Sequence, residues 1–154
     1  MNDYSKVKTG NEMELIFSAV SENEGLARVA AAAFVTTKNP TLEEVADIKT
    51  AVSEAVTNAI IHGYEEEEGK VILRCRFEEN VIWVEVEDKG VGIENIDRAM
   101  EPMYTTKPDM ERSGMGFSFM EAFMDELEVT SVPGEGTLVR MKKEIGVTPW
   151  IYEE

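Results

Sequence analysis

The sequence contains little of what disulfide, metal or nucleic-acid chemistry requires. Its 154 residues include one cysteine, Cys75, and one histidine, His62. A single cysteine excludes an internal disulfide and a multi-cysteine metal site, and a single histidine disfavours a histidine-rich one. The chain has 15 Lys and Arg against 31 Asp and Glu, a net charge of −16. We therefore expect neither a nucleic-acid surface, which needs clustered basic residues, nor binding to an anionic membrane.

Long apolar segments are also missing. The longest apolar run covers residues 29–35, far below the roughly 20 residues that a membrane-spanning helix needs. The N-terminus shows no charged-then-apolar leader. We expect a cytoplasmic protein in a reducing setting, with its acidic charge either solvated or complementary to a basic partner.

The hydrophobic pattern predicts a single domain at residues 11–143, between a lead-in at 1–10 and a tail at 144–154. Alternation at residues 12–17 predicts a strand. Ser21 followed by Glu24 forms a capping-box pattern that opens a helix to about residue 37. The expected apolar face of this helix consists of Leu26, Val29, Ala30, Ala33 and Phe34.

A second capping-box pattern, Thr41 with Glu44, opens a long helix. Gly63 is its expected C-terminal cap, because glycine adopts a positive φ without a Cβ penalty. Alternation then predicts strands near 71–77 and 82–88, with two arginines on the outer face of the first opposite two glutamates on the second. An irregular stretch at 93–113 has the length of a functional loop.

A further helix and two hairpin-connected strands complete the pattern. The element order is β-α-α-β-β-loop-α-β-β. This order predicts an α/β (α+β) two-layer sandwich, in which helices cover one face of a mixed, mostly antiparallel sheet.

Three polar residues follow one another along the long helix. Glu54, Asn58 and His62 are spaced four residues apart, so they share one face. Glu54 and Asn58 suit a proton acceptor beside a Mg²⁺ ligand, because Asn offers a neutral oxygen to an ion that keeps most of its waters. On local pattern alone, a polar pair facing water is the commoner explanation. His62 stays outside the expected catalytic set.

Asp88 continues the apolar row of its strand, so its carboxylate points inward. An unpaired buried charge is costly, and Asp88 therefore needs a partner. A carboxylate beside Gly90 and Gly92 suits an exocyclic amine such as that of adenine. The alternative is an aspartate that caps a turn, and the local pattern slightly favours it.

A second glycine pair, Gly114 and Gly116, precedes a helix. Backbone N–H groups at a helix start suit a phosphate, and Lys107 and Arg112 lie just upstream. Neither glycine pair matches a Walker A or a dinucleotide-binding loop, and each is weak alone.

Taken in order, these motifs resemble the GHKL (Bergerat-fold) superfamily of ATPases and kinases. They are Glu54-x-x-x-Asn58, Asp88-x-Gly-x-Gly, Gly114-x-Gly and the late Gly-x-Gly-Thr that ends at Thr137. Three longer segments are similar to the anti-sigma-F family of serine protein kinases of sporulating bacteria. They are Glu-Ala-Val-Thr-Asn-Ala-Ile-Ile-His-Gly at 54–63, Thr-Thr-Lys-Pro at 105–108 and Glu-Arg-Ser-Gly-Met-Gly-Phe at 111–117.

This resemblance implies a homodimer that binds ATP or ADP with Mg²⁺, phosphorylates a serine of an anti-anti-sigma protein and sequesters a sigma-F-like sigma factor. It implies that Glu54 is the general base, that Asn58 is the Mg²⁺ ligand and that Asp88 receives the adenine amine. It further implies a contact of Arg28, on the first helix, with a partner. The residues expected to line the nucleotide and its lid are Gly90, Gly92, Thr105, Lys107, Arg112, Gly114, Gly116 and, near the adenine, Thr137.

Three alternatives to the kinase stay open. A GHKL ATPase would use water as the nucleophile, but its chaperone and topoisomerase relatives carry large further domains. A histidine-kinase catalytic domain would need a phospho-accepting histidine on a separate helical hairpin. An ATP-regulated binding module would use the same fold without turnover.

Overall fold

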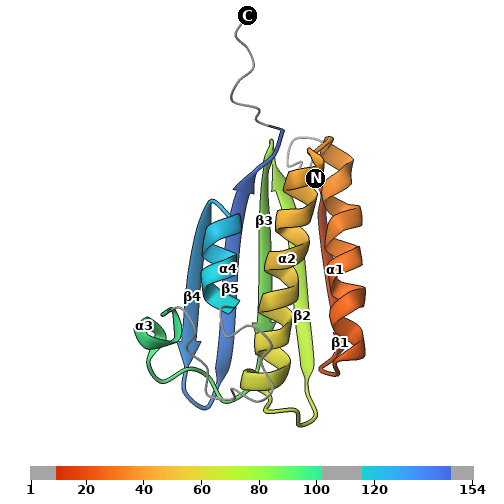
Figure 1. Ribbon diagram of the computed structural model, residues 1–154. Coiled ribbons are helices and arrows are strands. Elements are labelled where there is room, and N and C mark those ends of the chain that lie inside the picture. Colours follow the sequence, from red (N-terminus) through yellow and green to blue (C-terminus); the bar gives the residue numbers. More distant parts are fainter. Residues whose placement is uncertain (1–9, 102–115, 147–154) are drawn as a thin grey trace, which may run out of the picture.

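The computed structural model describes residues 10–101 and 116–146, which form a sheet covered on one side by helices (Figure 1). The strands are β1 (Glu12–Ser18), β2 (Lys70–Glu78), β3 (Val81–Asp88), β4 (Glu126–Val132) and β5 (Gly136–Glu144). The helices are α1 (Glu22–Val35), α2 (Leu42–Asn58), α3 (Ile96–Ala99) and α4 (Gly116–Phe123), with short helical turns η1 (Thr36–Lys38) and η2 (Ala59–Gly63).

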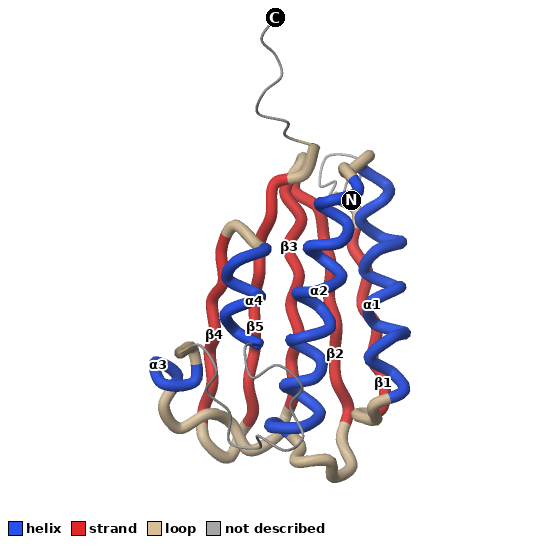
Figure 2. The backbone as a smooth tube through the Cα atoms, in the orientation of Figure 1, coloured by secondary structure: helices blue, strands red, loops and turns tan. Residues whose placement is uncertain are grey.

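The sheet has the strand order β1-β2-β3-β5-β4. Helices α1, α2 and α4 lie side by side on the same face of it (Figure 2). The predicted two-layer fold class is confirmed. All four strand pairings of the described chain are antiparallel, so this sheet is more uniform than the mixed one expected.

The core lies between the sheet and α2. The inward row of β3, Ile82, Val84 and Val86, is essentially inaccessible to solvent, as the alternation predicts. The α2 side chains that cover it are Ile48, Val52, Ala55 and Val56, each at most 1% exposed. At roughly 25 cal/mol per Å² of buried apolar surface, this layer is the main source of stability.

The predicted apolar face of α1 is wrong except at Phe34, which is buried as expected. Leu26 and Val29 are 49% and 60% exposed, whereas Ala27, Ala31 and Val35 are fully buried. Small side chains let α1 approach its neighbours closely, which the pattern of large residues did not indicate. The predicted capping box at Ser21 is also absent, because this residue has helical φ and ψ and makes no side-chain cap.

The capping box of α2 is confirmed, and it has an additional partner. Thr41 Oγ1 accepts the Glu44 N–H at 3.0 Å, and the Glu44 carboxylate accepts the Thr41 N–H at 2.8 Å. The same carboxylate receives the N–H of Gly146 at 3.1 Å. Ile145 beside it is buried. Ordered contacts therefore continue past residue 143, where the predicted tail begins.

The outer face of the sheet is a ladder of ion pairs. Arg74 contacts Glu85 at 3.3 Å and Glu87 at 2.8 Å, which confirms the predicted cross-strand pairing for this arginine, whereas Arg76 pairs with Glu78 of its own strand at 2.7 Å. The bond to Arg74 lowers the pKa of Glu87. Each such exposed pair contributes a few tenths of a kcal/mol to about 1 kcal/mol. This face is therefore solvated, and the candidate site belongs to the helical side.

Candidate functional site

A cavity of about 610 Å³ opens where α2 and its turn η2 meet the ends of β3 and β5. Five residues that the sequence singled out line it: Asn58, Asp88, Gly92, Gly116 and Thr137. They come from four separate parts of the chain, so the fold brings together what the sequence spreads over 80 residues. Its volume lies in the range of small-molecule and cofactor sites.

The end of α2 reaches this cavity through a π-helical turn. In η2 the N–H of Tyr64 bonds to the carbonyl of Ala59 at 2.9 Å, five residues back. Such wide turns are rare and often mark functional positions. Gly63 does not have the positive φ expected of a C-terminal cap, so that interpretation of this glycine is wrong.

Asp88 is buried at the base of the cavity, with 5% of its surface exposed. Its Oδ1 accepts the N–H of Gly90 at 2.8 Å, and the carboxylate also accepts the backbone N–H of Thr137. Burial raises the pKa of Asp88 to about 6, while these two N–H bonds oppose the rise. The predicted inward carboxylate with partners is confirmed, and it keeps acceptor capacity towards a ligand.

Thr137 lies directly opposite Asp88 in the β3–β5 register. Its Oγ1 is 2.8 Å from the hydroxyl of Ser131, which also accepts the N–H of Ile93 at 2.7 Å. The hydroxyl pair therefore ties the loop after β3 to the β4–β5 hairpin. Sequence analysis did not select Ser131, because one serine in a strand of alternating polarity carries no distinguishing signal.

Asn58 occupies the other end of the cavity. Its carboxamide lies against the first residue of α4: a Cβ built on Gly116 would be 3.1 Å from Asn58 Nδ2 and 3.3 Å from Oδ1. The first residue of α4 and the Asn58 carboxamide therefore lie next to each other. A neutral oxygen beside a helix N-terminus fits a Mg²⁺–phosphate group, since Mg²⁺ takes few protein ligands.

Glu54 lies one turn before Asn58 on α2 and is partly buried. It does not belong to the cavity lining formed by the described residues. Arg28 lies further away on α1, where it pairs with Glu24 at 2.8 Å and approaches Ser53 Oγ at 3.5 Å. Arg28 is therefore adjacent to the Glu54 turn of α2 and separate from the cavity.

Four selected residues, Thr105, Lys107, Arg112 and Gly114, lie outside the described residues. Conversely, the cavity wall includes residues that the sequence analysis left out of the site, namely His62, Gly63, Glu65, Asn95 and Arg98. The helical spacing of His62 from Asn58 was the available signal for it. Asn95 and Arg98 belong to α3 and its cap, in a stretch without periodicity.

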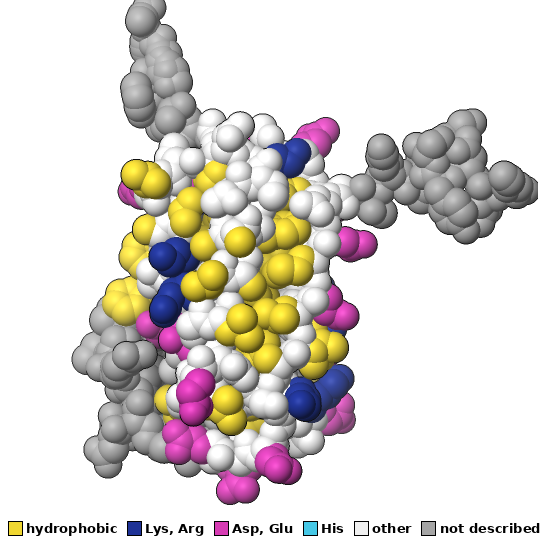
Figure 3. Space-filling model, turned by 90° about the vertical axis from the view of Figure 1, so that its right-hand side faces the viewer, with side chains coloured by type: hydrophobic (Ala, Val, Ile, Leu, Met, Phe, Trp, Pro, Cys, Tyr) yellow, Lys and Arg dark blue, Asp and Glu magenta, His cyan; other side chains and the backbone are white. Residues whose placement is uncertain are grey.

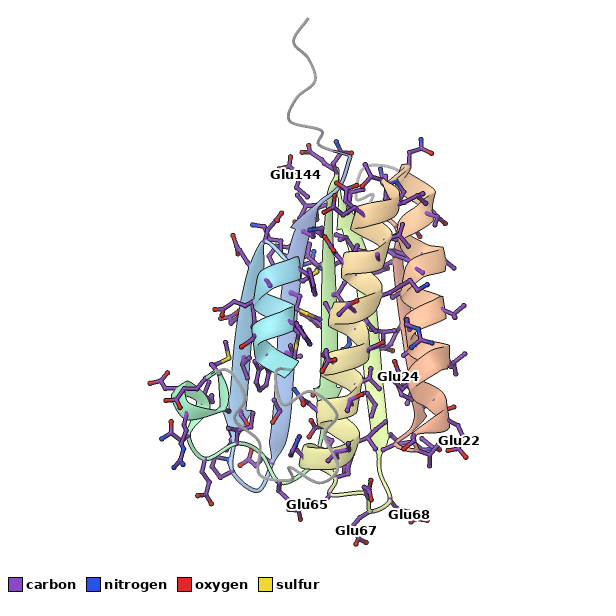
Figure 4. The ribbon with its side chains drawn as sticks, in the orientation of Figure 1. Glu22, Glu24, Glu65, Glu67, Glu68 and Glu144 are labelled. Carbon is purple, nitrogen blue, oxygen red and sulfur yellow. The ribbon has the colours of Figure 1, made fainter. Side chains whose placement is uncertain are left out.

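The acidic loop after η2 projects into solvent. Figure 4 shows Glu65, Glu67 and Glu68 at the end of the molecule where α2 finishes, with Glu144 at the opposite end and Glu22 and Glu24 along α1. Residues 65–68 are exposed, as expected of a solvated turn. Among the residues with described placement, no group of three or more His, Cys, Asp or Glu could hold a metal ion.

The fold and this cavity define a class of protein. A family model described as the histidine kinase-like ATPase domain matches residues 17–143, which places the chain in that class. The fold is also similar to a crystal structure of the RsbU and RsbW domains of a Mycobacterium tuberculosis protein, with a TM-score of 0.64 and 17% identity. That similarity covers 88% of this chain and 32% of the other, so the chain spans about a third of that protein.

Relatives with higher sequence identity show which family within this class the chain belongs to. The chain is 56% identical to the anti-sigma F factor of Clostridium acetobutylicum over 89% of its own length and 96% of the relative. It is 59% identical to the anti-sigma F factor of Clostridium perfringens, over 88% and 97% of the two chains. The chain belongs to the anti-sigma F factor family.

No helix in residues 10–101 or 116–146 combines the length and the hydropathy that crossing a membrane would require.

Proposed function

We propose that the chain is an ATP-dependent serine protein kinase that also acts as an anti-sigma factor. The observation that carries this proposal is the cavity with a buried carboxylate at one end and Asn58 at the other. In this proposal, Asp88 accepts the adenine amine and Thr137 borders the base. Gly90 and Gly92 let the loop after β3 approach the nucleotide, and Gly116 opens α4 towards the phosphates.

The proposed reaction is transfer of the γ-phosphoryl group of ATP to a serine of a protein substrate. The serine oxygen forms a bond to the γ-phosphorus, the bond from that phosphorus to the β–γ bridging oxygen breaks, and ADP leaves. Glu54 accepts the proton of the serine hydroxyl. Its location one turn from Asn58 suits that role, because the substrate hydroxyl must meet the terminal phosphate.

Asn58 is the proposed protein ligand of Mg²⁺, which would neutralise charge on the phosphates when bound. Thr105, Lys107, Arg112 and Gly114 are proposed to line the nucleotide and its lid. Their roles rest on the family motifs in 105–108 and 111–117.

The proposed partners are a sigma-F-like sigma factor, by analogy with the names of the relatives, and an anti-anti-sigma protein that supplies the serine. Arg28 is a proposed docking residue. Its side chain is 39% exposed and its guanidinium is held by Glu24, so the side chain is oriented and still accessible. Its proximity to Ser53 would direct a docked partner towards Glu54.

We further propose that the chain forms a homodimer through the face of α1 and β1. Ile16, Val20, Leu26 and Val29 are exposed there, and Figure 3 shows hydrophobic side chains gathered on this side of the molecule. Within the described residues β1 is an edge strand of the sheet, and an edge strand that no other part of a chain covers favours a partner on this side. Residues 11–143 would fold as one domain in the cytoplasm.

The test is incubation of the purified chain with Mg-ATP labelled at the γ-phosphate and with an extract of the host. The proposal expects label on a serine of one protein partner, and no label when Glu54→Gln replaces the wild type. Release of labelled phosphate alone would indicate an ATPase that uses water. Retention of all label in ATP that stays bound would indicate a nucleotide-regulated binding module.

A further inference from the structure

Gly63, the last residue of η2, lies directly against the carboxylate of Asp88. A Cβ built on Gly63 would lie 2.8 Å from Asp88 Cγ, 2.8 Å from Oδ2 and 2.9 Å from Oδ1. Real Cβ atoms do not approach other heavy atoms so closely. The space that a side chain at position 63 would occupy is therefore filled by the carboxylate.

Displacing the Asp88 carboxylate away from position 63 would weaken the hydrogen bonds that it accepts. Its Oδ1 is held by the N–H of Gly90 at 2.8 Å, and the backbone N–H of Thr137 holds it from β5. A movement away from position 63 would lengthen at least one of these bonds. Losing a hydrogen bond to a charged acceptor costs more free energy than losing one to a neutral acceptor.

The backbone of Gly63 also holds the loop that follows Asp88. Its carbonyl accepts the N–H of Val91 at 2.8 Å, and a Cβ on Gly90 would overlap this same carbonyl. The carbonyl is available because the π-helical turn ends here, and the last carbonyls of a helix have no partner within it. Gly63 thus contacts Asp88 through its missing side chain and the loop through its main chain.

We propose that Gly63 is a specificity-determining positioning residue, whose lack of a side chain fixes the Asp88 carboxylate where it reads the amine of the adenine ring. The proposal rests on the proposed function of Asp88 as the base-reading residue. It assigns to Gly63 a role in selecting the base, in addition to its place as the last residue of η2.

The experiment compares binding of ATP and of inosine triphosphate, which lacks the exocyclic amine, to the full chain by titration calorimetry. Wild type is expected to prefer ATP by at least tenfold. Gly63→Ala is expected to lose about tenfold in ATP affinity while inosine triphosphate affinity changes by less than twofold. A variant that keeps the wild-type preference, or that loses both ligands equally, would overturn the inference.

Gly25→Ala is the matched control. Gly25 lies within α1, and a Cβ there would meet only Arg28 Nη2, at an ordinary 3.7 Å. The same substitution therefore adds a methyl group without a clash, and the preference for ATP should persist. If Gly25→Ala also lost the preference for ATP, that preference would respond to any glycine replacement, and the inference would be overturned.

A thermal-unfolding cycle covers the case in which Gly63→Ala folds poorly. The drop in melting temperature caused by Gly63→Ala is measured in the wild type and in an Asp88→Ala background, without nucleotide. The inference expects most of the drop to vanish when the carboxylate is gone, and equal drops would contradict it. If the wild type bound neither triphosphate, the proposed function itself would be contradicted. This outcome is distinct from those that would contradict only the role of Gly63.

Discussion

The two ends of the cavity are built in different ways. At the end containing Asp88, the carboxylate is held by two backbone N–H groups, and Gly63 and Gly136 bring main chain directly against that residue. At the other end, Asn58 is a side chain of α2, and Glu54 lies one turn earlier on the same helix, outside the cavity lining of the described residues. The first end is fixed by the packing of three chain segments, and the second by the face of one helix.

This difference suggests that one end binds the base and the other supports phosphoryl transfer. An end assembled from close backbone contacts recognises a fixed shape, which suits binding of a base. An end assembled from side chains of one helix can be changed there without disturbing the rest of the fold, which suits a proton acceptor. Substitutions at the two ends should therefore separate nucleotide affinity from phosphoryl transfer.

The largest expected effect is on transfer. Glu54→Gln removes the proposed proton acceptor while preserving the shape of the side chain, so the transfer rate should fall by about 10²–10⁴-fold. ATP affinity should change little, because Glu54 is not among the described residues that line the cavity. Single-turnover assays with labelled ATP measure the rate, and an unchanged rate would remove Glu54 from the mechanism.

The next effect concerns stability and pH. Burial raises the pKa of Asp88 to about 6 from an ordinary 3.8, so the folded state favours the neutral acid. The resulting stabilisation is complete below pH 4 and is lost as the pH rises through about 6. Without nucleotide, the free energy of unfolding of wild type should decline relative to Asp88→Asn by up to about 3 kcal/mol between pH 4 and 7.

Urea unfolding of both proteins across this pH range measures the difference. Using Asp88→Asn as the reference cancels the titration of the other acidic groups. A constant difference in the free energy of unfolding would mean that Asp88 has an ordinary pKa in the fold.

Asp88→Asn should also test directly whether the Asp88 end of the cavity recognises the base. The amide supplies one acceptor oxygen and a donor in place of two charged acceptor oxygens. A hydrogen bond to a charged group contributes about 1.5–3 kcal/mol, so ATP affinity should fall by roughly 10- to 100-fold. GTP presents a carbonyl in place of the adenine amine and should lose less, and equal losses in calorimetric titrations would argue against base recognition.

The smallest effect should come from Arg28, which lies apart from both ends. Arg28→Glu is expected to weaken binding of the sigma factor or the anti-anti-sigma protein by about tenfold and to leave ATP affinity unchanged. Arg76→Glu, on the outer sheet face, is the control, since its side chain is 40% exposed against 39% for Arg28. Equal weakening of partner binding in the two variants would point to net charge alone.

Much of the fold was predictable because it depends on strong periodic patterns. The alternation in β2 and β3 predicted their inward rows, and it placed Asp88 among them before any contact was known. α2 combines a true capping box with large apolar residues on one face. In α1 two of the four buried residues are the alanines Ala27 and Ala31, which the pattern of larger side chains did not select, and Leu26 and Val29, which it placed on the apolar face, are exposed.

Part of the site could not be predicted, because it depends on distances between remote segments. Gly63 was expected to serve as a cap, yet its importance lies in the approach of Asp88, 25 residues later. Ser131 joins Ile93 to Thr137 through one hydroxyl, and no local pattern distinguishes it from an exposed serine. Asn58 and Asp88 were selected because each belongs to a recognisable motif.

The most direct test measures ATP affinity and transfer rate together in wild type, Glu54→Gln and Asp88→Asn. The account predicts that Glu54→Gln keeps its affinity and loses transfer at saturating ATP. It predicts that Asp88→Asn loses affinity and recovers at least half of the wild-type transfer rate once ATP is saturating. If both variants lost affinity and saturated rate in the same proportion, the two ends of the cavity would not act separately, and the account would be contradicted.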